Sequence, residues 1–194
     1  MVGFECKNCG MCCSGYKGIQ VNLTIGDIYR ICELLLISVD EFFGKYAGLK
    51  PFKDPRHPKT FDMDIGLNMP CKFRKDNKCS IYPARPLNCR IFPYWLLVRA
   101  PENKLKELLK GKCEYKLDKK SLKKYAKYQE ILGELIIKES KMYEINKTSK
   151  IKGIKIKPDI HEIKASIIKN LDIIKMDRVR IIEAEKILKG FFLL

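Results

Sequence analysis

The chain has 194 residues, with 39 Lys and Arg against 23 Asp and Glu, a formal net charge of +16 and nine cysteines. Its 46% hydrophobic content is enough for a packed core, which excludes disordered, collagen-like and low-complexity classes. No apolar stretch approaches the roughly 18 residues that a membrane-spanning helix needs, so we expect no membrane span.

The first residues, from Met1 to Cys6, lack the basic and apolar segments of an export signal. We therefore expect a cytoplasmic protein, and in that reducing compartment metal ligands or redox thiols explain nine cysteines better than disulfides do. The composition keeps a disulfide framework as an alternative. Abundant Lys, Glu and Ile with only two Gln is typical of hyperthermophile proteins, in which intracellular disulfides occur.

Two helices are predicted near the N-terminus. Thr24 and Asp27 form an acidic variant of the capping box, and apolar residues at helical spacing follow, which predicts a helix over residues 25–36. The start signal recurs at Ser38, and a second, short helix should end near Gly44 or Gly48.

Residues 50–93 are rich in proline, which predicts loops. Over residues 50–70 we expect an irregular segment with at most a short extended piece from Ile65 to Met69. Further prolines up to Pro93 prevent any long helix after this segment. Ligands in this part of the chain would therefore be presented by loops.

The last third of the chain has a helical pattern. Apolar residues recur every three or four positions over residues 117–145, which predicts a long amphipathic helix. The lysine-alternating strip 151–156 predicts a short strand or a linker. Pro158 fits the first turn of another helix, whose apolar face runs from Ile160 to Ile174. We expect these two long helices to pack together.

Seven cysteines form three groups in the first half of the chain: Cys6, Cys9, Cys12 and Cys13, then Cys71 and Cys79, then Cys89. A two-residue gap lets two sulfurs point at one ion while backbone amides bond to them. Because histidine is scarce, the donor set is almost purely sulfur. Such soft sets select zinc, iron-sulfur clusters or copper(I).

Two cysteines lie outside these three groups, and one group contains an adjacent pair. Cys32 lies inside the first predicted helix and is expected to be a small buried residue. Cys113 is the candidate eighth ligand, since two four-thiolate sites need eight. Side chains of neighbouring residues diverge, so we expect Cys12 and Cys13 to serve two metals, or one to ligate while the other is free or bridging.

The non-cysteine residues extend this pattern. It reads Phe4-x-Cys6-x2-Cys9-Gly10-x-Cys12-Cys13, Leu23-Thr24 with Asp27, Cys71-x-Phe73, Cys79-x-Ile81-Tyr82 and Arg85-Pro86-x2-Cys89-Arg90-x-Phe92-Pro93. It resembles the YkgJ-type cysteine-cluster proteins, described as zinc- or iron-chelating domains and named for the CxxCxxCC motif. The resemblance covers residues 4–98. It implies a metal centre at Cys6, Cys9, Cys12, Cys13, Cys71, Cys79 and Cys89.

These observations predict a mainly α-helical fold with irregular, metal-stabilised loops and little β-structure. We expect residues 1–115 to form a cysteine-cluster metal-binding domain. Residues 116–194 would be a basic helical extension packed on it. Because the proline-rich loops have little regular structure of their own, metal binding would supply part of the folding energy.

Two functions fit this architecture. The Cys-x2-Cys-x2-Cys run resembles three ligands of a ferredoxin-type [4Fe-4S] cluster, which favours an iron-sulfur protein with a redox, sulfur-handling or group-transfer role. A related motif in flagellin lysine methylases suggests the group-transfer option. The alternative is a zinc-stabilised, non-enzymatic module whose basic helices bind nucleic acid or an acidic protein partner. No catalytic residue is identified from the sequence.

Charged residues suggest possible partners. Lysines at 119, 120, 123, 124 and 127 cluster on the first long helix, and such a surface attracts nucleic acid or an acidic protein partner through counterion release. Against this, a charge run is usually a solvated face, and lysine enrichment is also typical of thermophile proteins. Arg85 and Arg90 flank Cys89 and could offset thiolate charge or bind an acidic substrate, or could form structural ion pairs and hydrogen bonds to loop carbonyls.

Overall fold

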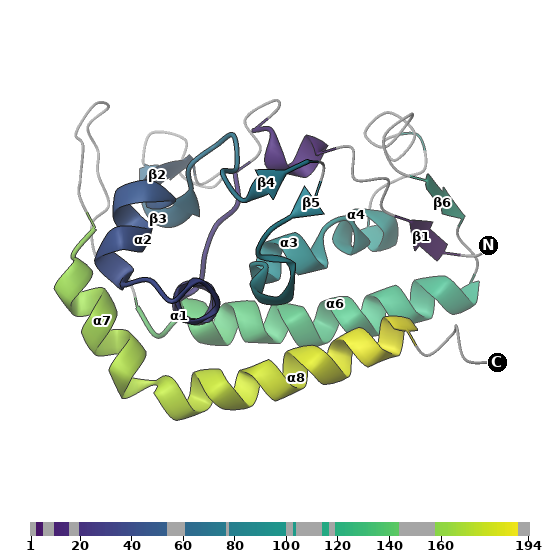
Figure 1. Cartoon of the computed structure of the whole chain (residues 1–194). Coiled ribbons are helices and arrows are strands. Elements are labelled where there is room, and N and C mark those ends of the chain that lie inside the picture. The colour runs from purple at the N-terminus through teal and green to yellow at the C-terminus, as the bar shows by residue number, and fades with distance from the viewer. Residues whose placement is uncertain are drawn as a thin grey trace.

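The computed structural model describes residues 3–5, 10–15, 20–53, 61–76, 78–99, 103, 114–116, 119–143 and 158–189. The chain is mainly α-helical, which confirms the predicted fold class (Figure 1). The α-helices are α1 (Ile25–Leu35), α2 (Val39–Lys45), α3 (Leu87–Ile91), α4 (Tyr94–Arg99), α6 (Lys119–Ser140), α7 (Ile160–Lys169) and α8 (Leu171–Lys189). The described residues also include two short 3-10 turns, η1 (Met11–Cys13) before α1 and η3 (Tyr82–Ala84) before α3.

The described strands form antiparallel pairs. β1 (Gly3–Glu5) pairs with β6 (Glu114–Lys116), β2 (Ala47–Lys53) with β3 (Phe61–Leu67), and β4 (Arg74–Lys75) with β5 (Lys78–Cys79). The β2–β3 ladder contradicts the irregular segment that the prolines predicted. Pro51 is tolerated because it lies in a two-stranded ladder, where no third strand needs its missing N–H. The ladder brings the buried residues Ala47, Ile65 and Leu67 into the core.

The first two helices begin as their capping residues predict. The Thr24 hydroxyl accepts from the Asp27 N–H at 3.1 Å, and the Asp27 carboxylate accepts from the Thr24 N–H at 3.1 Å, so the capping box is complete. Leu36 ends α1 in a left-handed conformation. The Ser38 hydroxyl caps α2, which ends at Lys45, next to the first glycine proposed for its end.

The C-terminal part contains a break that the apolar spacing did not predict. Instead of one helix after residue 158, α7 and α8 are separated at Asn170, whose side chain donates to the Ser166 carbonyl at 2.8 Å. The N-cap of α7 is Asp159, so Pro158 precedes the helix and does not occupy its first turn. The lysine-alternating strip 151–156 lies outside the described residues.

The helix pair α6 and α8 lies against the N-terminal part, with α7 beside α2 (Figure 1). Ion pairs of Lys138 with Asp177 and of Arg180 with Glu134 fix an antiparallel register for the pair. Two apolar clusters join the early and late segments. One combines residues of α1, α2 and β3 with Ile163, Ile167 and Ile174, and the other packs Leu87 against Tyr128, Leu132, Leu135, Ile181 and Ala184.

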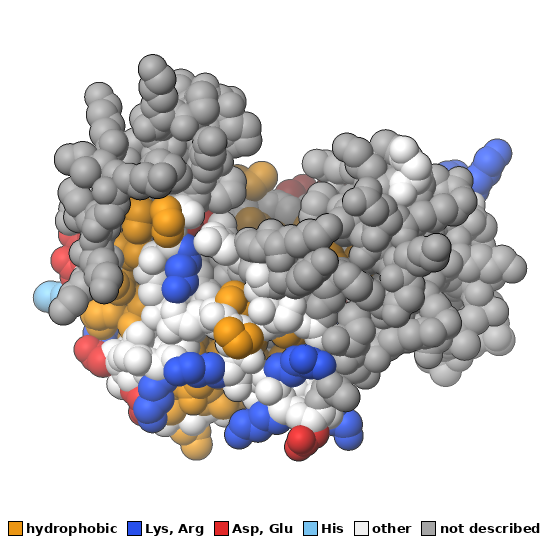
Figure 2. All heavy atoms as spheres, turned by 90° about the horizontal axis from the view of Figure 1, so that it is seen from above, with side chains coloured by type: hydrophobic (Ala, Val, Ile, Leu, Met, Phe, Trp, Pro, Cys, Tyr) orange, Lys and Arg blue, Asp and Glu red, His pale blue; other side chains and the backbone are white. Residues whose placement is uncertain are grey.

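The face seen in Figure 2 carries Lys and Arg side chains gathered along one edge, in keeping with the net charge of +16. Among the described residues, no helix is both long enough and apolar enough to cross a membrane.

Candidate metal centre

Five of the seven predicted ligands lie in described segments, and the fold brings those segments to one region. Cys12 and Cys13 are in η1, Cys71 is in the turn before β4, Cys79 ends β5, and Cys89 is in α3. All five side chains are half-buried thiols, and the last three pack against the larger apolar cluster. Cys6, Cys9 and Cys113 lie outside the described residues.

The adjacent pair does not diverge as expected. The sulfurs of Cys12 and Cys13 lie 3.7 Å apart. A tetrahedral ion with sulfur bonds of 2.3 Å places neighbouring thiolates about 3.8 Å apart, so this spacing is compatible with two ligands on one ion. The Cys71 N–H donates to the Cys13 carbonyl at 2.7 Å, and the two side chains interact as well. These contacts hold the first and second cysteine groups together.

The thiols differ in their readiness to lose a proton. Hydrogen bonds from Cys12 and Cys71, with the nearby Arg74 cation, lower the pKa of Cys13, whereas the shared hydrogen bond and burial raise the pKa of Cys71. Burial also raises the pKa of Cys89 and of Cys79. The contact between Cys13 and Cys71 therefore favours one thiolate in this pair, and a bound metal cation would displace protons from the other thiols.

A glycine brings a cation next to these sulfurs. Gly10 has a φ of +73°, and a Cβ built there would lie only 2.0 Å from the Arg74 Cζ. Any larger residue at this position would therefore both strain the backbone and displace the guanidinium group. Sequence reasoning identified Arg85 and Arg90 but missed Arg74, because its approach to Cys13 depends on a turn and a hairpin far apart in the sequence.

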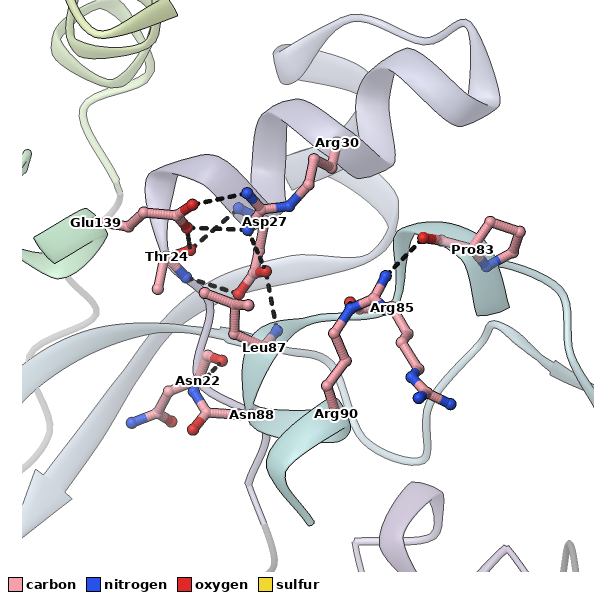
Figure 3. Close-up of polar contacts among 10 residues, drawn as sticks. All are labelled: Asn22, Thr24, Asp27, Arg30, Pro83, Arg85, Leu87, Asn88, Arg90 and Glu139. Atoms are coloured by element: carbon pink, nitrogen blue, oxygen red, sulfur yellow. Dashed lines mark hydrogen bonds and ion pairs between the residues drawn. The ribbon is translucent and has the colours of Figure 1, made fainter. Parts of the chain in front are cut away.

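A buried polar network fixes the start of α3, two residues before Cys89 (Figure 3). Arg30 donates to Asp27 at 2.8 Å and to both carboxylate oxygens of Glu139 at 2.6 and 2.9 Å. The Leu87 N–H donates to the same oxygen of Asp27 at 3.0 Å. Since the three charged side chains are at most 3% exposed, this network ties α1, α3 and α6 together in the interior.

The close fit around Glu139 depends on Gly26 and Thr24. A Cβ at Gly26 would lie 2.3 Å from the carboxyl carbon of Glu139, and the Thr24 hydroxyl donates to that carboxylate. Burial raises the pKa of Glu139, while the hydrogen bond from Arg30 opposes that rise. Sequence reasoning did not identify this network, because the contact joins residues at the start of the first helix to one in α6.

Arg85 and Arg90 both make contacts with other residues of the fold. Arg90 donates to the carbonyls of Arg85 at 2.9 Å and Pro83 at 2.5 Å, and it pairs with Glu185 of α8. Arg85 lies 4.0 Å above the centre of the Tyr82 ring and 3.4 Å from Glu185. The structural interpretation of these arginines is therefore confirmed. Both charges also act to lower the pKa of Cys79, against the larger effect of its burial.

The donor set fits a soft metal, because the described cysteines supply sulfur next to a stabilised thiolate. Within the described ranges no three Cys, His, Asp or Glu side chains stand in a geometry that could hold a metal ion. The described thiols thus form part of the predicted ligand set, to which Cys6 and Cys9 belong as well.

Comparisons with known proteins agree with the cysteine pattern. Residues 5–114 match the family model "CxxCxxCC: Putative zinc- or iron-chelating domain". The "Uncharacterized protein MJ0661" of Methanocaldococcus jannaschii is 31% identical over 104 residues, which is 50% of this chain and 48% of that protein. The chain thus aligns with about half the length of this curated relative. No solved structure matches the chain.

Proposed function

Because this chain belongs to the CxxCxxCC family of zinc- or iron-chelating domains, we propose that its cysteines bind iron as an iron-sulfur cluster of the [4Fe-4S] type. The proposed ligands come from Cys6, Cys9, Cys12, Cys13, Cys71, Cys79 and Cys89. One observation carries the proposal: Cys13 of η1 contacts Cys71, while Cys71, Cys79 and Cys89, from the turn before β4, from β5 and from α3, pack against one apolar core. A cluster held there would supply one-electron transfer, or a site for sulfur or group transfer.

The surrounding residues support an anionic thiolate centre. Arg74 places positive charge beside Cys13, and Arg85 and Arg90 act on Cys79. Positive charge offsets the mutual repulsion of several thiolates and favours their deprotonated form. The hydrogen bond from the Leu87 N–H to Asp27 holds the helix that carries Cys89 in place. The chain therefore orients the thiols and balances their charge.

Zinc is the second candidate, favoured by the 3.7 Å between the sulfurs of Cys12 and Cys13. In a four-iron cluster each cysteine binds a different iron, so ligand sulfurs need not approach so closely. Two sulfurs at the edge length of a tetrahedron suit one ion. Under this alternative the metal stabilises the loops, and function lies on the basic helices.

Metal and sulfide analysis separates the two candidates. The full chain would be purified without oxygen, and its iron, zinc and acid-labile sulfide measured with its absorption spectrum. We expect about four irons and four sulfides per chain and a brown protein, because the cluster absorbs visible light. A colourless protein with one or two zinc ions and no sulfide would contradict the iron-sulfur proposal and support the zinc alternative.

A further inference from the structure

The first half of α6 presents a one-sided row of cations. At 100° per residue its lysines fall within an arc of about 140°, along about 12 Å of helix axis. The buried residues Tyr125 and Tyr128 occupy the opposite side and face the core. We call this row the lysine stripe, and its members are Lys119, Lys120, Lys123, Lys124 and Lys127.

The lysine stripe opposes helix stability. Its members lie three and four residues apart, so like charges repel across successive turns. The first turn contains no acidic residue, although the helix dipole favours negative charge there. Burial and the neighbouring Lys120 lower the pKa of Lys124, which is the direction expected for crowded cations. Residues that oppose their own helix in this way are expected at functional or strained sites.

Carboxylates on the following turns pair with other cations. Glu134 of α6 pairs with Arg180, at 2.9 Å. Glu185 of α8 receives Arg90 and Arg85. Of the lysine stripe, Lys119, Lys123 and Lys127 are exposed at the N-terminal end of α6, which lies where α8 finishes (Figure 1).

We propose that the lysine stripe binds the sugar-phosphate backbone of a nucleic-acid duplex. Duplex DNA carries one negative charge per about 1.7 Å of its axis. A row of lysines about 12 Å long therefore runs beside about seven phosphate charges. Lysine ammonium groups are point charges that position a backbone without reading bases. This inference is independent of which metal the cysteines bind.

The side chains around the lysine stripe favour a duplex over other anionic partners. Single strands are bound by exposed aromatic residues on which bases stack, and the tyrosines of this stretch, Tyr125 and Tyr128, are buried. Membrane-surface helices bury large apolar residues beside their lysines. Within residues 119–127, all of which the structure describes, no large hydrophobic side chain is exposed. A second copy of this chain would be repelled by its charge of +16.

The test is the salt dependence of duplex binding by the full chain. Binding is measured through the fluorescence anisotropy of a labelled 20-base-pair DNA. Replacing Lys119, Lys123 and Lys127 by Gln should lower the slope of log affinity against log salt by up to about 3, since each phosphate contact contributes about 0.9. The affinity at low salt should fall by more than about tenfold. A matched control, Lys141→Gln, Lys169→Gln and Lys175→Gln, removes three exposed lysines elsewhere and should change neither quantity.

Three outcomes would overturn the proposal. The first is equal loss of affinity in both triple variants, which would mean that net charge alone drives binding. The second is competition by polyglutamate as effective as that by duplex of the same charge, which would indicate an acidic protein partner. The third is tighter binding to phosphatidylserine vesicles than to duplex. Circular dichroism of each variant confirms that the helices remain folded.

Discussion

Replacing Arg30 by Met is expected to lower the free energy of unfolding by about 3 to 5 kcal/mol. Arg30 is 3% exposed and lies between two fully buried carboxylates, those of Asp27 and Glu139. Methionine keeps most of the apolar volume, so the loss reports on charge more than on packing. Without the guanidinium group, the carboxylates of Asp27 and Glu139 stay buried and lose their ion pairs with Arg30. Urea denaturation at fixed metal content measures the change.

A surface pair provides the matched control. Arg180→Met removes an arginine of similar reach from its pair with Glu134, but the two side chains are 42% and 59% exposed. We expect a loss of about 0 to 1 kcal/mol, because solvent screens exposed ion pairs. In the double variant Arg30→Met and Glu139→Gln, part of the lost stability should return, since one buried charge is removed. Equal losses for Arg30→Met and Arg180→Met would show that the buried network does not stabilise the fold.

Replacing Cys13 by Ser is expected to remove most of the bound metal, with a drop in affinity of more than about 100-fold, since changes in outer-shell partners alone cost 10- to 100-fold. The sulfur of Cys13 lies 3.7 Å from that of Cys12, and the backbone of Cys13 bonds to Cys71. A hydroxyl at this position is a harder, weaker donor for a soft metal. Competition with a chelator, followed by metal analysis, measures the effect.

Cys32 is the internal control for this prediction. It lies in α1 with 8% exposure, 3.9 Å from the carbonyl of Ser38, as its place inside a predicted helix suggested. Cys32→Ala should therefore leave the metal content unchanged while lowering stability modestly, through the loss of a small buried side chain. If Cys13→Ser and Cys32→Ala retained equal metal, the proposed ligand assignment would be wrong.

Local signals in the sequence predicted the helices well. The capping box of Thr24 and Asp27 set the start of α1, and the three-four spacing of apolar residues located α6. The β2–β3 ladder was missed because Pro51 and its neighbours favour turns locally, whereas pairing with residues 61–67 is a long-range contact. The break at Asn170 was missed because the apolar spacing continues across it and does not depend on the side-chain hydrogen bond to Ser166.

For the candidate site too, local sequence features were predictable and tertiary contacts were not. Spacing identified the cysteines, since ligand chemistry depends on residue type and short gaps. It could not give the approach of Cys12 to Cys13, which depends on side-chain rotation, or the place of Arg74 against Gly10. The network of Asp27, Arg30 and Glu139 could not be predicted from the sequence either, because these ion pairs form only when distant helices pack together. These contacts come from tertiary structure and leave no periodic pattern.

X-ray absorption at the edge of the metal that copurifies with the full chain tests whether thiolates alone hold the metal. We expect a first shell of sulfur only, at about 2.3 Å, with metal-metal scattering when the centre is an iron-sulfur cluster. A first shell dominated by nitrogen or oxygen would contradict it, because the cysteine cluster would then not be the metal site.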